Sequence, residues 1–111
     1  MVLSKALPTK DYSKIDNVSL FCIACEWGQF DVVKYFLEND RDLMNVVDEN
    51  GRSGFHIACQ HGHVNIVKHM LCVKGTRVSM PDRSGKTGCL IACENRQWKV
   101  VEIIALHNLC H

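Results

Sequence analysis

Apolar residues recur at helical spacing in two adjoining segments between residues 53 and 73. In the first segment, Phe55, Ala58 and Cys59 follow the i, i+3, i+4 spacing of one helical face. The second segment carries a similar stripe, made of Ile66, Val67, Met70 and Leu71. Gly62 separates the two segments, and glycine readily adopts the left-handed conformation that often ends a helix. The pattern therefore predicts two short helices joined by a tight turn.

The same pattern occurs three times in the chain, at intervals of 34 residues. Residues 19–37 match residues 53–71 at nine of nineteen positions, and residues 48–67 match residues 82–101 at seven of twenty. Unrelated segments would agree at about one position at ordinary residue frequencies. The chain is therefore read as three copies of one helix-turn-helix unit. We expect one hydroxyl residue to cap the first helix of each copy: Ser19, Ser53 and Thr87.

When the copies are combined from Asp48 onward, they read D-x-x-G-x-S/T-x-φ-x-I-A-C-x-x-G-H-x-x-I-V-K-x-x-L. This pattern resembles the ankyrin repeat, which contains T-P-L-H-x-A, then G-H, then a V-V-K-x-L-L helix. The tetratricopeptide repeat has a similar period, but its W-x2-L-G-x2-Y signature is absent here. The resemblance covers residues 17–106 and implies an all-α solenoid of stacked helix-turn-helix units joined by hairpin-like loops.

The repeat pattern also predicts the domain organisation, which is a single ankyrin-repeat domain over the whole chain. The first 16 residues carry no repeat pattern, and we expect them to form a flank or a partial cap. The three repeats are then predicted to span residues 17–47, 48–81 and 82–111, the last with the C-terminal end.

Two departures from the family pattern bear on the turns and helix ends of the copies. Leu20, Gly54 and Gly88 stand where the family has the proline of T-P-L-H, and we expect the two glycines to loosen that turn. Arg96 replaces the glycine that ends the first helix in the third copy. A left-handed backbone at a residue other than glycine costs on the order of 1 kcal/mol. The third repeat is therefore predicted to be the weakest.

Histidines are concentrated in the second copy, which raises the question of a metal site. His56 and His63 match the T-P-L-H and G-H histidines of the family, which implies that they bond backbone groups and tie the turn to neighbouring helices. The other copies carry different residues at both positions, and no zinc-ligand spacing such as C-x2-C…H-x3-H occurs. We therefore predict no metal site.

The cysteines allow two interpretations. Cys25, Cys59 and Cys93 share one repeat position, where the family usually has alanine, so we expect them to pack as small apolar residues. Cys22 and Cys25 form a C-x-x-C motif, but it lies inside a helical repeat and not after a strand. The alternative to a binding module is a thiol- or metal-responsive protein that uses Cys22, Cys25 and His56.

Charge and composition exclude several functions. The chain has thirteen Lys and Arg residues and twelve Asp and Glu residues, so its charge is nearly balanced. The sequence therefore predicts no nucleic-acid partner and no membrane partner. No segment approaches the roughly 20 apolar residues of a membrane span, and no secretory signal is found, so we expect an intracellular protein, cytoplasmic or nuclear. No catalytic or phosphate-loop signature has the required spacing. The chain is predicted to be no enzyme and to use no cofactor.

The resemblance implies a concave protein-binding face, built from the hairpin tips and the first helices. The family's variable positions correspond to these residues: Val18, Glu26, Trp27, Glu49, Asn50, Arg52, Gln60, His61, Arg83, Ser84, Lys86, Glu94 and Asn95. We expect Trp27, His61 and Asn95 to form one column across the groove. Trp27 and Arg52 are the first choices for binding energy, because Trp and Arg are favoured at interface hot spots. In the alternative, Trp27 packs against the N-terminal segment as a cap.

The C-terminal helix is rich in apolar residues, namely Ile103, Ile104, Leu106 and Leu109. Solenoids need polar faces at their ends, so this face is expected either to be partly covered by Trp98 or to self-associate. In a third interpretation, the chain is a structural fragment of a longer ankyrin array.

Overall fold

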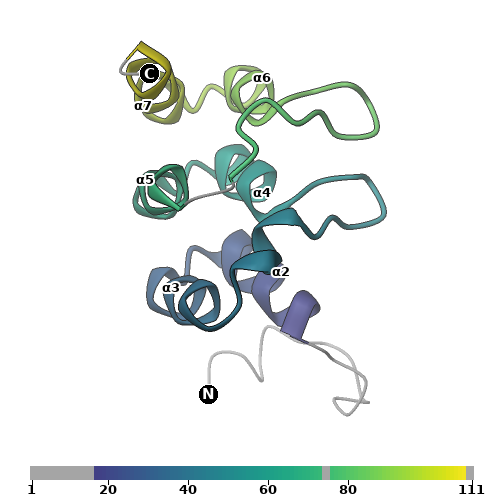
Figure 1. The fold of residues 1–111 in the computed structure, drawn as a ribbon. Coiled ribbons are helices and arrows are strands. Elements are labelled where there is room, and N and C mark those ends of the chain that lie inside the picture. Colours follow the sequence, from purple (N-terminus) through teal and green to yellow (C-terminus); the bar gives the residue numbers. More distant parts are fainter. Residues whose placement is uncertain (1–16, 74–75, 110–111) are drawn as a thin grey trace.

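The computed structural model describes residues 17–73 and 76–109. Within these ranges the chain forms helices, turns and loops, and no strand (Figure 1). The elements are α2 (Asn17–Trp27), α3 (Phe30–Asn39), the 3-10 helix η2 (Arg41–Asn45), α4 (Gly54–His61), α5 (Val64–Cys72), α6 (Gly88–Glu94) and α7 (Trp98–Leu109). This arrangement confirms the predicted all-α fold class.

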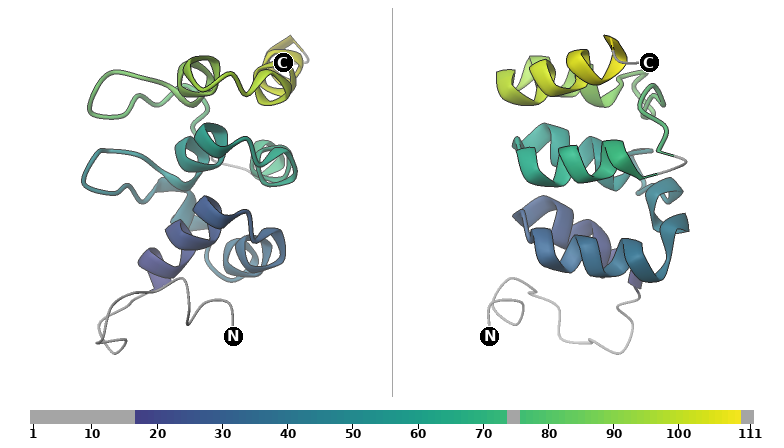
Figure 2. Two further views of the ribbon diagram at one scale, coloured as in Figure 1. Left: turned by 180° about the vertical axis from the view of Figure 1, so that it is seen from behind. Right: turned by 60° about the vertical axis from the view of Figure 1, so that its left-hand side comes forward.

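The α-helices stack as three pairs, one above the other (Figure 1). The inner helices α2, α4 and α6 form one column, and the outer helices α3, α5 and α7 form the second. Two long hairpin-like loops, before α4 and before α6, project from the side of the stack opposite the outer helices (Figure 2). Each pair contacts the pair next to it, which is the architecture of a solenoid.

Hydroxyl side chains cap two of the inner helices. Ser53 caps α4 by accepting a hydrogen bond from the backbone N–H of His56, and the His56 ring accepts one from the N–H of Ser53 in return. This reciprocal pair is a capping box with histidine in the place that glutamate or glutamine usually takes. Thr87 caps α6 by accepting from the N–H of Leu90 at 3.3 Å. Both predicted caps are confirmed.

The first inner helix begins differently from the other two. The expectation that Ser19 caps it is wrong, because α2 already begins at Asn17 and Ser19 lies within its first turn. The cause is local, since the position taken by glycine in the other copies is Leu20 here. Leucine is a good helix former, and glycine is a poor one, so the helix extends further toward the N-terminus.

Close packing between layers explains the two glycines at the start of α4 and α6. A Cβ added to Gly54 would lie 2.6 Å from Cε2 of Phe21 and 2.9 Å from Sγ of Cys25. A Cβ added to Gly88 would lie 2.8 Å from Cε2 of Phe55, which is the same contact one layer further along. Both glycines are buried. The sequence suggested only that they loosen the turn, and the structure adds a packing role, because their missing side chains let the inner helices approach each other.

The core runs continuously through the stack between the inner and outer helices. Its largest fully buried side chains come from every layer: Phe21, Val33, Phe55, Ile66, Met70, Ile91, Val100 and Ile104. Cys25 and Cys59 are also fully buried within it, as their packing role requires. Cys93 occupies the same repeat position in the last layer and is only half buried.

The end of the third layer differs from its sequence-based description. Ile104 was expected on an exposed apolar face, but it is 1% exposed and belongs to the core. The large apolar side chains exposed in this layer are instead Leu90, Trp98 and Leu106, and Trp98 is itself 61% exposed. The side chain of Leu109 lies outside the described residues. The apolar face that remains is smaller than predicted, because one turn of α7 points its isoleucine inward.

No helix in the described ranges is long and apolar enough to span a membrane.

Replacing Gly54 with alanine distinguishes the two roles considered for this residue. If glycine merely loosened the turn, alanine would stabilise the fold by reducing the entropy of the unfolded chain. The contact with Phe21 predicts the opposite, a loss of about 1–3 kcal/mol in the free energy of unfolding, because the added methyl overpacks the core. Urea denaturation of the variant and of Asn65→Ala, an exposed helical control on α5, measures the difference. A stabilised Gly54→Ala protein would contradict the packing argument.

The backbone of Arg96 offers a stabilising substitution. Its φ is 60°, and among the described residues it is the one non-glycine residue with a positive φ, as the sequence predicted for this turn. Arg96→Gly is expected to stabilise the chain by about 1 kcal/mol, since glycine adopts this conformation without a steric penalty. Arg96→Ala is the matched control, because it removes the charge and keeps the Cβ. Thermal unfolding should show a higher Tm for the glycine variant alone.

Candidate functional site

Each hairpin-like loop is built around an aspartate at its base. In the first loop, the backbone N–H of Asp48 donates to the carbonyl of Arg52 at 3.0 Å, and Gly51 closes the turn with a φ of 74°. The carboxylate oxygen Oδ1 of Asp48 accepts from the N–H groups of Asn50 and Arg52 at 2.8 and 3.0 Å. The D-x-x-G pattern is therefore a self-contained turn, in which aspartate bonds the tip and glycine supplies the left-handed residue.

The second loop repeats this geometry with Asp82 at its base. Oδ1 of Asp82 accepts from the N–H groups of Ser84 and Lys86 at 2.8 and 2.9 Å. The two tips are joined as well, because the N–H of Arg83 donates to the carbonyl of Asn50 at 3.0 Å. The loops thus form one continuous ledge along the stack.

A buried ion pair braces the two loops against each other and against α4. Nε of Arg52 lies 3.1 Å from Oδ2 of Asp82, whose side chain is 1% exposed. Nη1 of Arg52 donates to Oε1 of Gln60 at 2.7 Å. The N–H of Lys86 and the Arg52 guanidinium together hold the pKa of Asp82 below its usual value. Two of the three guanidinium nitrogens of Arg52 are therefore bonded within the chain.

The predicted partner-binding residues lie on the ledge or on the inner helices, except Asn95, which directly follows α6. Nine of these side chains are exposed: Glu26, Trp27, Glu49, Asn50, His61, Arg83, Ser84, Glu94 and Asn95. Four are half-buried: Val18, Arg52, Gln60 and Lys86. Trp27, the first choice for binding energy, is 58% exposed at the C-terminal end of α2. In the third layer, Nζ of Lys86 is paired with Oε1 of Glu94 at 2.8 Å.

A hollow of about 330 Å³ gathers part of this set. It lies where the ends of α2 and α4 meet the first loop, and seven residues line it: Glu26, Asp48, Asn50, Arg52, Ile57, Gln60 and His61. We call it the Glu26 hollow. Asp48 and Ile57 were not among the predicted partner-binding residues. The predicted residues of the third layer lie outside the hollow.

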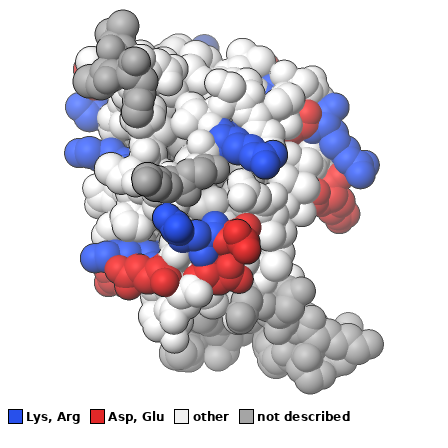
Figure 3. Space-filling model, in the orientation of Figure 1, with Lys and Arg blue, Asp and Glu red and all other residues white. Residues whose placement is uncertain are grey.

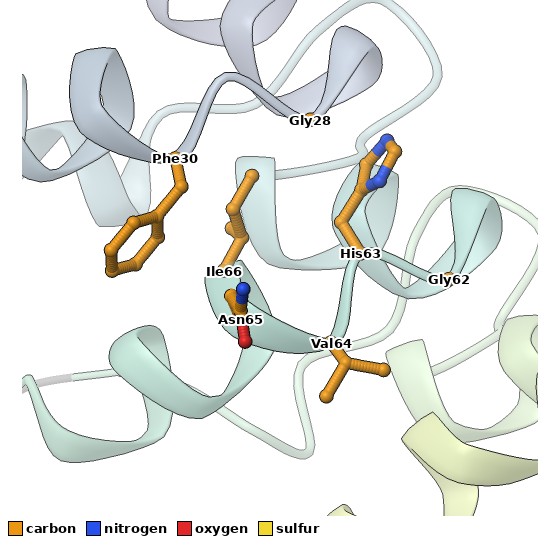
Figure 4. A pocket seen from close by; sticks show the side chains of 7 residues that line it. All are labelled: Gly28, Phe30, Gly62, His63, Val64, Asn65 and Ile66. Atoms are coloured by element: carbon orange, nitrogen blue, oxygen red, sulfur yellow. The ribbon is translucent and has the colours of Figure 1, made fainter.

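A second hollow, of about 270 Å³, lies at the turns between inner and outer helices (Figure 4). In Figure 4 the ring of His63 points toward Gly28, and its Nε2–H donates to the carbonyl of Glu26 at 2.8 Å. No predicted binding residue lines this second hollow. The His63 bond confirms that this histidine ties one turn to the neighbouring layer.

Charged side chains of both signs are interspersed with neutral residues on the face seen in Figure 3. This agrees with the near-balance of thirteen basic and twelve acidic residues in the sequence. Neither sign covers the face, so nothing in this view resembles the basic field that a nucleic acid would need.

Comparison with known families decides the classification. A family model for ankyrin repeats, in three copies, matches residues 21–110. The chain belongs to the ankyrin-repeat family. Proteins of this family generally bind other proteins through surfaces of the solenoid.

Solved structures show the same fold, although no curated protein matches the sequence. A similar chain occurs in the structure of the Bd0816 predatory endopeptidase from Bdellovibrio bacteriovorus in complex with immunity protein Bd3460. The two chains superpose with a TM-score of 0.73 at 24% sequence identity, over 85% of this chain and 47% of that chain. The ankyrin-repeat chain therefore spans about half the length of this solved relative.

The histidine of the capping box is hydrogen-bonded through both of its ring nitrogens. Nδ1 of His56 accepts from the N–H of Ser53 at 3.1 Å, and Nε2–H donates to the carbonyl of Met80 at 2.8 Å. The hydroxyl oxygen of Ser53 also lies 2.9 Å from Nδ1. Burial lowers the pKa of His56 below its ordinary value of 6.5. This confirms the structural role expected for His56.

The thiols of Cys25 and Cys59 are poor nucleophiles. Burial raises the pKa of Cys25 far above its ordinary value, and Cys59 behaves in the same way. Among the described residues, no group of three or more histidine, cysteine, aspartate or glutamate side chains is arranged to hold a metal ion. Because Cys25 is buried and both nitrogens of His56 are bonded, the geometry disfavours the thiol- or metal-responsive alternative.

The lowered pKa of His56 predicts a loss of stability in mildly acidic solution. The unfolded chain takes up a proton on this histidine near pH 6.5, and the folded chain resists it, so stability falls as pH drops below 6.5. His56→Asn is expected to be less stable at pH 7.5 by about 1–3 kcal/mol, from lost buried hydrogen bonds, and to lose less further stability at pH 5.5. Urea denaturation at both pH values measures this. His61→Asn, an exposed control on the same helix, should keep the pH dependence of the parent chain; an equal dependence in His56→Asn would contradict the assignment.

Proposed function

We propose that this ankyrin-repeat chain is a non-catalytic protein–protein interaction module that binds its partner on the concave face formed by the loops and the inner helices. The observation that carries this proposal is the braced ledge. Arg52 and Asp82 lock the two loops together, while Trp27 and His61 beside them remain exposed. A rigid surface loses little conformational entropy on binding, which favours affinity.

Trp27 is the residue on which we expect the interface to depend most. A large exposed aromatic side chain buries much apolar area when a partner covers it, and tryptophan is enriched at hot spots. Arg52, by contrast, supports binding through the shape of the ledge, because its guanidinium contacts Asp82 and Gln60. The partner is a protein of unknown identity. We place the chain inside the cell, in the cytoplasm or nucleus, where the buried thiols of its core stay reduced.

Self-association through the third layer is the second candidate. Leu90, Trp98 and Leu106 form its exposed apolar side chains, and a further repeat or a second copy would cover them. The same surface would join this chain to neighbouring repeats if it belongs to a longer array. Trp98 and Trp27 are equally exposed, so they provide matched probes of the two surfaces.

Affinity capture from a lysate of the source organism tests which tryptophan contacts the partner. We expect Trp27→Ala to weaken capture about thirtyfold, or about 2 kcal/mol for a hot-spot residue, and Trp98→Ala to leave it unchanged. Quantitative mass spectrometry measures recovery, after circular dichroism confirms that both variants fold. Loss of capture with Trp98→Ala alone would show that the partner binds the third layer and not the concave face. Equal capture by both variants would refute a concave site centred on Trp27.

A further inference from the structure

The Glu26 hollow carries an excess of negative charge. Two of its lining residues, Glu26 and Asp48, are carboxylates, and Arg52 is its one lysine or arginine. The charge of Arg52 is balanced by Asp82, which lies outside the hollow at 3.1 Å from Arg52 Nε. In the described part of the chain, no ion pair or hydrogen bond neutralises the carboxylate of Glu26. The two carboxylates are therefore left without a cation of their own.

The remaining lining of the Glu26 hollow suits a long side chain with a charged end. Ile57 belongs to the core and is 9% exposed, so it gives the hollow a small apolar contact among otherwise polar residues. The aliphatic stem of a lysine or arginine packs on such a contact while its charged group reaches polar partners. Asp48 keeps its Oδ2 available, because the two turn N–H groups bond to Oδ1. Trp27, the next residue after Glu26, adds an exposed aromatic ring on the same helix end.

From these contacts we infer that the Glu26 hollow is a subsite for a basic side chain of the partner protein, with arginine preferred to lysine. This inference rests on the proposed function and adds the chemistry of the partner to it. A guanidinium has five N–H donors in a fixed plane and can bond two separate carboxylates, whereas an ammonium group is a compact point charge. Desolvation of the hollow by the bound partner strengthens the interaction with Glu26 and Asp48.

The probe for this subsite is N-acetyl-arginine amide, titrated into the 15N-labelled full chain and followed by two-dimensional NMR. We expect concentration-dependent shifts at the amides of Asn50, Gln60 and His61, which line the Glu26 hollow. N-acetyl-citrulline amide has nearly the same shape without the charge, and it should cause no comparable shifts. Glu26→Gln should weaken binding of the arginine probe about three- to fivefold, as expected for a solvent-accessible ion pair.

Glu38→Gln is the matched control, since Glu38 is an exposed carboxylate on the outer helix α3. A second variant, Asp48→Asn, keeps an acceptor oxygen for the turn and removes the other charge of the hollow. Binding that depends on Glu26 and Asp48 but not on Glu38 supports the inference. Absent shifts, shifts outside the hollow, equal shifts with citrulline, or unchanged binding to Glu26→Gln would each overturn it.

This outcome is separable from that of the capture experiment. If capture requires Trp27 while the arginine probe does not bind, the concave face remains the interface and the basic subsite is rejected. If the probe binds the Glu26 hollow while capture is independent of Trp27, the subsite exists and the interface is not centred on Trp27.

Discussion

The structure depends on the close contact between a glycine at the start of one inner helix and a phenylalanine of the preceding layer. Gly54 against Phe21, and Gly88 against Phe55, set how closely the layers approach. That spacing places the loop tips within hydrogen-bonding distance of each other, as the bond between Arg83 and Asn50 shows. A wider spacing would separate the loops and leave their backbone groups to water. The ledge is therefore a consequence of how the core packs.

A second repeated contact couples the layers on the far side of the inner helices. Nε2 of His63 donates to the carbonyl of Glu26, and Nε2 of Gln97 donates to the carbonyl of Gln60 at 3.2 Å. The donors occupy the same repeat position and differ only in residue type. Each satisfies a carbonyl near a helix end, which otherwise lacks an intrahelical partner. The same hydrogen bond between layers thus recurs at this repeat position, although the residue that donates it differs.

The sequence predicted the helices, two of the three caps and the left-handed backbone at Arg96, because these are local properties of spacing and residue type. It did not predict the role of Gly54, since the methyl it excludes would strike Phe21, thirty-three positions earlier in the chain. The Glu26 hollow was predicted in part, from variable positions of the family. Asp48 was missed because an aspartate in such a turn is expected to spend its carboxylate on the backbone of the turn. In the structure both turn N–H groups bond to Oδ1, and Oδ2 remains available to a ligand.

The role of Arg52 illustrates why the layers cannot be considered separately. Its position among variable residues suggests recognition, but its guanidinium is held by Asp82 from the next layer and by Gln60. Without Asp82, the cation of Arg52 would balance one carboxylate of the Glu26 hollow, and the excess of negative charge would shrink. The buried aspartate of the third layer therefore sets the electrostatic character of a surface between the first two layers. Although the layers of a solenoid contact only their neighbours, this ion pair lets a residue of the third layer change the net charge of a surface between the first two layers.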